Sequence, residues 1–296
     1  MELSWLIKLR IAAVAATGVI LIGILAWPLA APHDPLGAVR FSNLSYLGAI
    51  YLVLIAFLVG FFSYFISWPY GREIGILAVP SGLAIWAGRS GSLAELIQLS
   101  PTLSQRQALF ASLKWEPFFW LLIIAAGLAG VIFGQKIWPK SHKAETLVKS
   151  NPQPAKYLNA VVALIGSAFI AYLCIKILAQ DFTMSNNALV AQPAVGQIIF
   201  AVLVSFGLAA FVVNKFLKTS YIWPTIASIL VTAFAITTYA KQDVLQNFME
   251  SWPATFFSSS VVCVLPLQMV VFGSLGSIAG YWIAIRYTYH GKHEQK

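Results

Sequence analysis

The sequence predicts an all-α, polytopic transmembrane helical bundle of about eight helices. Three observations predict it: the composition, a series of long apolar segments, and basic residues that lie in the stretches between those segments. Hydrophobic residues make up 59% of the 296-residue chain and charged residues 10%, whereas soluble domains have about 45–50% and about 25%. So few charges cannot cover the surface of a soluble domain of this length, and the bilayer is the solvent that fits.

Eight segments are apolar enough to cross about 30 Å of hydrocarbon, which takes about 20 helical residues. They are residues 11–30, 45–66, 74–88, 117–137, 158–179, 194–214, 221–240 and 256–285. The third is short and contains Pro80, and the eighth is long and contains Pro266, so we expect a kink or an interfacial turn in the eighth. The first is long for the apolar region of a secretion signal and is interpreted as a retained helix.

The distribution of Lys and Arg predicts that both chain ends are cytoplasmic. If all eight segments cross, five of the 19 basic residues fall in outer connectors and Lys176 lies near the outer end of the fifth segment, which leaves 13 on the inner side (19 − 5 − 1). The five are Arg40, Arg89, Arg106, Lys114 and Lys241. The compact loops favour a bacterial inner (cytoplasmic) membrane. The net charge of +9 forms no continuous stripe, so we expect membrane lipids as partners and no nucleic acid.

Internal similarity predicts two four-helix halves in parallel duplication. Segments one and five match at an offset of 148 residues, as in Gly18/Gly166, and the same offset pairs Gly48 with Gly196. Segments four and eight match at 146, with glycines in identical spacing: Gly127, Gly130 and Gly134 against Gly273, Gly276 and Gly280. Repeat-built membrane proteins show such similarity. The predicted parts are a first half at 1–140, a basic cytoplasmic linker at 141–157, and a second half with a short basic tail at 158–296.

The same six glycines are candidate helix-packing residues. Glycines four residues apart lie on one helix face and let two backbones approach closely. The sequence leaves open which helix each face contacts.

Residues 89–116 form the most distinctive segment outside the eight. Leu93, Leu96 and Ile97 recur at helical spacing, Pro101 interrupts the pattern, and Ser104 is a candidate cap for a second helix. The pattern predicts two short amphipathic helices in the outer interface. They would act either as a lid over a cavity or as a rim that covers helix ends.

Four polar residues are candidates for a polar pathway or an interface. Ionisable groups within a membrane are functional candidates because burying a charge in hydrocarbon is costly. Lys176 lies near a helix end, where its side chain can reach the headgroups, and Arg89 and Glu116 lie at helix mouths. Thr232 belongs to a series of hydroxyls in the seventh segment, which either line a pathway or bond to their own backbone.

The sequence predicts no catalytic residue, no cofactor and no metal site. All four histidines lie outside the eight segments, and both cysteines, Cys174 and Cys263, are interpreted as packing residues. No phosphate-binding loop, HExxH or GxSxG motif is present.

The leading hypothesis is therefore a non-enzymatic scaffold or accessory subunit that packs against other membrane-protein subunits or associates with itself. The alternative is a transporter or channel for a small neutral or amphipathic solute, with its route through a cavity between the repeats. A third class, an enzyme acting on lipid, would depend on Glu116 and Arg89 as an acid/base pair.

Overall fold

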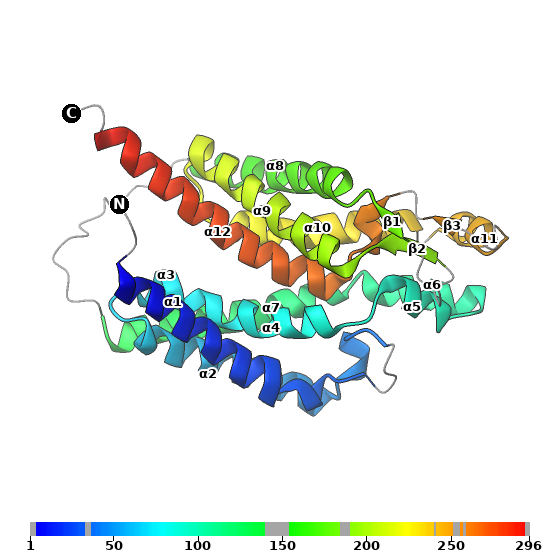
Figure 1. The fold of residues 1–296 in the computed structure, drawn as a ribbon, viewed down its shortest axis with the longest axis horizontal. Helices are drawn as coiled ribbons and strands as arrows, with labels where there is room; N and C mark the ends of the chain where they lie inside the picture. The colour runs from blue at the N-terminus through cyan, green and yellow to red at the C-terminus, as the bar shows by residue number, and fades with distance from the viewer. Residues whose placement is uncertain are drawn as a thin grey trace. The chain divides into compact units, whose positions relative to one another are not determined.

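A computed structural model describes residues 4–32, 37–139, 154–183, 190–239, 241–250, 255–256 and 259–293. Nearly all of these residues are helical (Figure 1). Six helical stretches are long and apolar enough to cross a membrane: Trp5–Leu25, Tyr46–Ile66, Leu103–Ile137, Tyr157–Leu178, Val195–Leu217 and Pro266–Thr288. A shorter apolar helix covers Ile222–Thr238. The predicted helical membrane class is confirmed at this level.

The elements of the first 140 residues follow the predicted segments closely. They are α1 (Trp5–Gly18), η1 (Val19–Leu25), η2 (Trp27–Leu29), η3 (Phe41–Asn43), α2 (Tyr46–Ile66), α3 (Gly71–Ile74), η4 (Gly75–Leu77), α4 (Ala78–Arg89), α5 (Leu93–Gln98), α6 (Leu103–Leu113) and α7 (Glu116–Ile137). The η1 stretch is a π-helix, in which the Ala26 N–H donates to the Leu21 carbonyl, and nothing in the apolar pattern predicted it.

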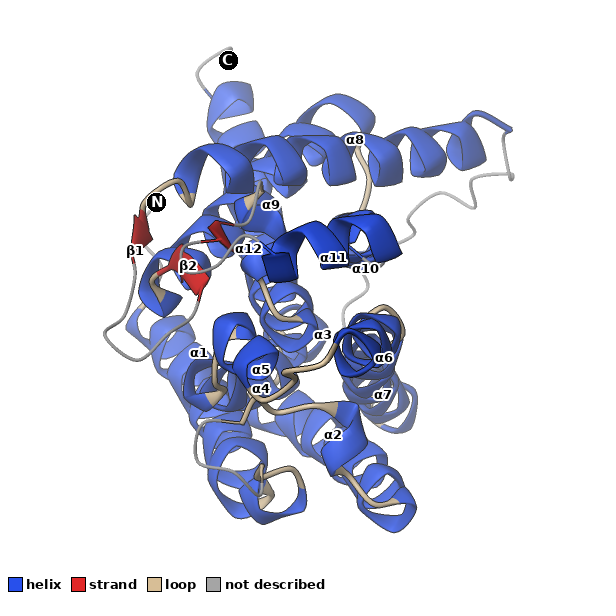
Figure 2. Cartoon of the chain, turned by 90° about the vertical axis from the view of Figure 1, so that its right-hand side faces the viewer, coloured by secondary structure: helices blue, strands red, loops and turns tan. Residues whose placement is uncertain are grey.

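The later elements include three short strands that the sequence analysis did not predict. They are α8 (Pro154–Leu178), β1 (Phe182–Thr183), β2 (Val190–Pro193), α9 (Val195–Leu217), α10 (Ile222–Tyr239), α11 (Gln242–Glu250), β3 (Thr255–Phe256), η5 (Ser260–Cys263) and α12 (Pro266–His293). β2 pairs antiparallel with β1 and parallel with β3 (red in Figure 2). Pro266 is the first residue of α12, a position where its missing N–H costs nothing. The predicted eighth segment, 256–285, therefore does not begin as a helix: it starts at the end of β3 and includes the 3₁₀ turn η5 before α12 begins.

Side-chain caps determine where the two short helices of the 89–116 segment begin. Ser92 and Glu95 form a capping box at α5, and Thr102 and Gln105 form another at α6. The cap of α6 is thus Thr102 and not Ser104, whose hydroxyl instead lies 3.2 Å from the Thr102 hydroxyl. Both predicted helices are present.

The chain divides into two compact units. The first consists of Met1–Leu29, Leu44–Ile85 and Leu122–Val162, and the second of Ala30–Asn43, Trp86–Leu121 and Ala163–Lys296. The predicted linker at 141–157 lies mostly outside the described residues.

Glycines hold two helix pairs of the first unit in close contact. A Cβ added at Gly18 of α1 would lie 1.8 Å from the Ala78 carbonyl oxygen of α4, and one at Gly60 of α2 would lie 2.0 Å from the Gly127 carbonyl oxygen of α7. Only glycine allows backbones to approach this closely. The Tyr64 hydroxyl then donates to the Trp138 carbonyl at 2.7 Å, which ties the end of α2 to the end of α7.

The second unit is built on the close packing of α9 against α12, with α10 also contacting α12 (Figure 1). A group of short elements lies at one end of this unit (Figure 1). We call this group the cap; it consists of α5, α6, α11, η5 and the three strands. Within it α6 contacts α10 and α11. The Ala94 N–H donates to Gln192 Oε1 at 3.1 Å, and Gln268 Nε2 donates to the Ala87 carbonyl at 3.3 Å. The cap therefore joins segments from distant parts of the chain.

Candidate functional site

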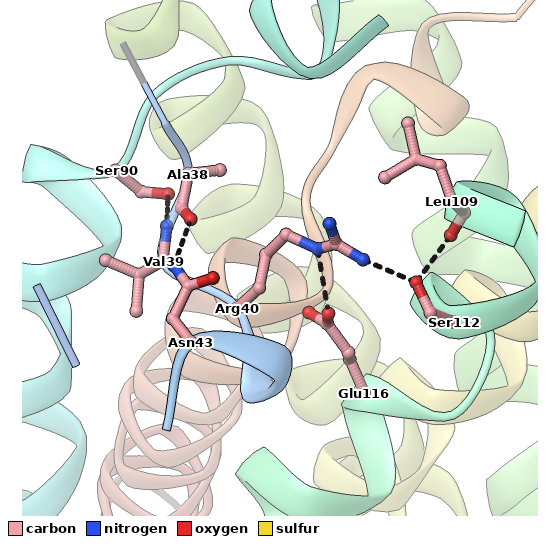
Figure 3. A network of polar contacts seen from close by, with 8 residues as sticks. All are labelled: Ala38, Val39, Arg40, Asn43, Ser90, Leu109, Ser112 and Glu116. Atoms are coloured by element: carbon pink, nitrogen blue, oxygen red, sulfur yellow. Dashed lines mark hydrogen bonds and ion pairs between the residues drawn. The ribbon is translucent and has the colours of Figure 1, made fainter. Parts of the chain in front are cut away.

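A buried ion pair lies at the point where α6 leads into α7, within the second unit. Arg40 Nε lies 3.2 Å from Glu116 Oε1, and an Arg40 terminal nitrogen donates to the Ser112 hydroxyl at 2.5 Å (Figure 3). The Glu116 side chain is 4% exposed and that of Arg40 is 19% exposed. Ser112 in turn donates to the Leu109 carbonyl at 2.7 Å. One guanidinium group thus binds both the last turn of α6 and the first residue of α7.

The segment that carries Arg40 is itself held by two polar contacts. The Val39 N–H donates to the Ser90 hydroxyl at 3.0 Å, and Asn43 Nδ2 donates to the Ala38 carbonyl at 3.1 Å (Figure 3). Residues 38–43 are therefore fixed to the end of α4 on one side and to the α6–α7 junction on the other.

Aromatic rings surround the buried carboxylate. Phe41 packs on Phe119 with ring centroids 4.6 Å apart, and Trp86 meets Trp120 edge to face at 6.5 Å. The Trp120 indole nitrogen lies near the Glu116 carboxylate, but neither Nε1 nor Oε2 completes a hydrogen bond among the described residues. Among the described residues, Arg40 is thus the basic side chain that pairs with Glu116, and the Phe41 backbone also contacts this carboxyl group.

This geometry makes the cluster a structural brace. A buried carboxylate that lost its only counter-ion would be strongly destabilised, so the pair fixes how residues 38–43 and the α6–α7 junction meet.

The sequence analysis singled out Glu116 but not its partner. Arg40 was counted only as an outer charge, because 76 residues separate the two and no local pattern joins them. Arg89, the residue considered beside Glu116, is exposed in the last turn of α4.

The predicted packing glycines lie on helix faces that contact other helices. In the first unit Gly130 sits against Phe57 and Phe61, and Gly134 against the Tyr64 ring. In the second unit Gly276 sits against Leu203 and Gly207, Gly280 also sits against Gly207, and Gly273 faces the Phe206 ring. Gly127 of α7 faces Val79 of α4. The helices that the sequence left open are therefore α2 and α4 for α7, and α9 for α12.

Thr232 is buried in α10 and donates to the Ser228 carbonyl at 2.8 Å. The neighbouring hydroxyls do the same: Thr225 donates to the Tyr221 carbonyl, and Ser228 to the Thr225 carbonyl. These three hydroxyls thus donate to backbone carbonyls of their own helix, which is the second of the two alternatives predicted for the series.

Lys176 is exposed in the last turn of α8. Among the described residues, no three His, Cys, Asp or Glu side chains come together to hold a metal ion. His33 and His142 lie outside the described residues. Cys263 is buried and Cys174 half-buried, and both are free thiols.

By length and composition, the six long apolar helices place this chain in the class of multi-pass helical membrane proteins. Comparison with protein-family models, with curated proteins and with solved structures found no match to this chain.

Proposed function

We propose that the chain is a tandem duplication of a four-helix unit and that it serves as a non-enzymatic scaffold or accessory subunit in a membrane complex. The scaffold role is supported mainly by the exposed apolar faces of α1 and α8, which are the first helices of the two proposed halves. Each buries one narrow stripe and exposes large apolar side chains over the rest of its surface.

The contacts of the packing glycines support the duplication. Gly130 meets residues 57 and 61 of α2, and Gly276 meets residues 203 and 207 of α9. Each of the second set lies 146 residues after the first (276 − 130, 203 − 57, 207 − 61). Two helix pairs thus use the same contact register in the two halves.

The burial patterns of the same helices support it independently. The buried residues of α2 include Leu52, Ala56, Val59, Gly60, Ser63 and Tyr64. Those of α9 include Ile198, Val202, Ser205, Phe206, Ala209 and Ala210, each 146 residues later. The paired residues of α2 and α9 differ in side-chain size at most of these positions. What the two helices share is therefore the face that is buried, and not the residues on it.

Helix directions support eight crossings. Contacts between α2 and α7 advance in the same direction along both helices, from Gly60–Gly127 to Tyr64–Gly134, so the two are parallel. Contacts between α9 and α12 do the same, from Leu203–Gly276 to Gly207–Gly280. If only the six long helices crossed, α2 and α7 would be consecutive crossings and therefore antiparallel. Crossings by the short helices α4 and α10 would account for both parallel pairs.

The outward faces of α1 and α8 support the scaffold role. The buried stripe of α8 is Ala163, Ser167, Ala171 and Ile175, and it continues to Ala179 just after the helix. The buried stripe that begins in α1 with Val14 and Gly18 continues through Ile22 of η1 to Ala26 and Ala30. On the other faces Ile165 is 61% exposed, Phe169 63% and Ile24 52%. A duplicated protein with two such faces can bind two similar helices of partner subunits, or further copies of itself, with lipid covering what remains.

Extraction in several mild detergents followed by native mass spectrometry tests this role. We expect a complex of defined stoichiometry, and we expect I165A/F169A to reduce it because the substitutions remove side chains from the outer face of α8. The matched control is L54A/L58A on the exposed face of α2. A lone, stable protomer in every mild detergent would count against the scaffold.

Transport of a small neutral or amphipathic solute is the second candidate, and two hydroxyls favour it. Ser167 Oγ of α8 and Ser205 Oγ of α9 are buried and have no hydrogen-bond partner among the described residues. Buried hydroxyls with bonding capacity left are what a polar route through helices requires.

Solute flux into proteoliposomes distinguishes the two functions. A transporter predicts flux that falls when Ser205 is replaced by Ala, and T232V tests whether α10 lines the route. Flux equal to that of empty liposomes would remove this candidate.

A further inference from the structure

Three exposed basic side chains lie in the C-terminal parts of α9 and α12: Lys215 in the last turn of α9, Lys218 at its C-cap, and Arg286 beside Tyr287 in the last third of α12. We call them the basic end. Neither helix contains Asp or Glu, and none occurs in residues 217–222. The ion pair found in the described part of the chain joins Arg40 to Glu116. The three cations therefore have no carboxylate to neutralise them among the described residues.

The Lys215 ammonium is positioned by aromatic rings. It lies 4.6 Å from the Tyr287 ring centroid and 5.9 Å from those of Phe211 and Phe216. A ring attracts a cation through its quadrupole but carries no net charge, so it orients the ammonium without neutralising it.

The backbone around Lys218 is also held in place. Lys218 has a left-handed conformation with φ 53° at the end of α9, and Asn214 Nδ2 donates to the Thr219 carbonyl at 2.8 Å. Because α9 and α12 are parallel, their C-termini lie at the same end of the pair. The basic end therefore presents its cations from ordered backbone.

Exposed rings beside the cations indicate what the partner must cover. Phe216 is 74% exposed and Tyr287 is 59% exposed. A soluble anion would neutralise the cations but leave both rings in water. An anionic phospholipid satisfies both requirements, because its phosphate meets Lys and Arg while its glycerol and upper acyl chain cover the rings. We propose that the basic end of α9 and α12 binds the phosphate headgroup of an anionic phospholipid.

Native mass spectrometry of the delipidated full chain, titrated with dioleoyl-phosphatidylglycerol or with dioleoyl-phosphatidylcholine, tests the site. We expect the chain to retain phosphatidylglycerol preferentially. Removing one cation near the membrane surface lowers anionic-lipid binding about fivefold, so K215Q/K218Q should lower it about 25-fold. Binding of phosphatidylcholine should not change, and K215R/K218R should keep the preference.

The matched control is K176Q/K241Q, which removes two exposed lysines elsewhere in the chain. An equal loss in this control, or no preference for phosphatidylglycerol in the unmodified chain, would overturn the proposal. Displacement of the lipid by millimolar inorganic phosphate would show instead that the site takes a soluble anion. The measurement uses the isolated chain, so its outcome does not depend on whether the protein is a scaffold.

Discussion

Arg40 and Glu116 are each other's counter-ion although 76 residues separate them in the chain. Glu116 is almost completely buried, so replacing Arg40 leaves a carboxylate in an apolar shell, and replacing Glu116 leaves a half-buried guanidinium without its acid. We expect R40Q or E116Q to destabilise the fold by about 2 kcal/mol, less than for a fully buried pair because Arg40 is partly exposed. Thermal unfolding in a mild detergent measures the loss.

A double-mutant cycle separates the pair from its surroundings. R40Q/E116Q should cost clearly less than the sum of the two single variants, because the double variant leaves no uncompensated charge. Lys176→Gln serves as the control and should not change the unfolding temperature. Additive losses for R40Q and E116Q would mean that the two side chains do not depend on each other.

Glycine substitutions provide a second residue-scale prediction. A Cβ at Gly130 would lie 2.0 Å from the Phe57 carbonyl oxygen, so α2 and α7 must move apart, and we expect Gly130→Ala to lower stability by about 1–3 kcal/mol. No atom lies within 4 Å of a Cβ at Gly166. Gly166→Ala should therefore be neutral or slightly stabilising, because alanine favours a helix. The same unfolding assay applies, and equal effects would contradict the packing described.

The glycines also show what can and cannot be predicted from a match between two segments of the sequence. The spacing of Gly127, Gly130 and Gly134 predicts close helix packing because the requirement for small residues is local, and a Cβ added at Gly130 would collide with the backbone of Phe57. The match of Gly18 to Gly166 did not indicate equivalent environments, because a Cβ added at Gly18 would collide with the Ala78 carbonyl, whereas one at Gly166 would meet no atom within 4 Å. In an apolar helix one shared residue says little about which face is buried.

At the scale of elements, the stretch from α3 to α4 is the decisive case. Residues 71–89 form a nearly continuous helical segment of ~28 Å, close to the thickness of the hydrocarbon core. In the proposed eight-crossing arrangement, this segment returns the chain between the parallel helices α2 and α7. Glu73 and Gly88 are both exposed and lie near its two ends.

Cysteine labelling tests this crossing. In a background without Cys174 and Cys263, Glu73→Cys and Gly88→Cys should react with an impermeant maleimide from opposite sides of the membrane. Labelling of both from the same side would make the segment re-entrant and would reduce the number of crossings.

The long elements were predictable and the short ones were not, for a physical reason. A spanning helix needs about 20 consecutive apolar residues, so the composition of a segment is enough to predict it. The strands Phe182–Thr183 and Thr255–Phe256 are two residues each and form only because β2 lies between them. A run of two residues is too short to show the alternating pattern of a strand. In addition, the residues that pair between β2 and β3 lie 65 positions apart (255 − 190), and Arg40 and Glu116 lie 76 apart, so no local pattern joins either pair.

At the scale of the whole molecule, the compact units do not follow the order of the chain. Trp86–Leu121, from the first half, belongs to the same unit as Ala163–Lys296. In that unit the Ala94 N–H donates to Gln192, Gln268 donates to the Ala87 carbonyl, and α6 contacts α10 and α11. Residues 86–121 thus contact later segments of the second unit through the cap and through α10 and α12. In the proposed duplication, the two halves would therefore not be independent of each other.

Cleavage of the chain between the halves tests that interdependence. With a protease site inserted at residue 145, between α7 and α8, the two fragments should stay together through affinity purification in a mild detergent, because the cap is built from both. Gln268→Leu combined with Gln192→Leu removes two of the polar contacts between the segments and should make the cleaved pair dissociate more readily, whereas the uncleaved chain should lose little stability. Fragments that separate completely after cleavage of the unmodified chain would mean that each half folds alone and that the cap contacts add little.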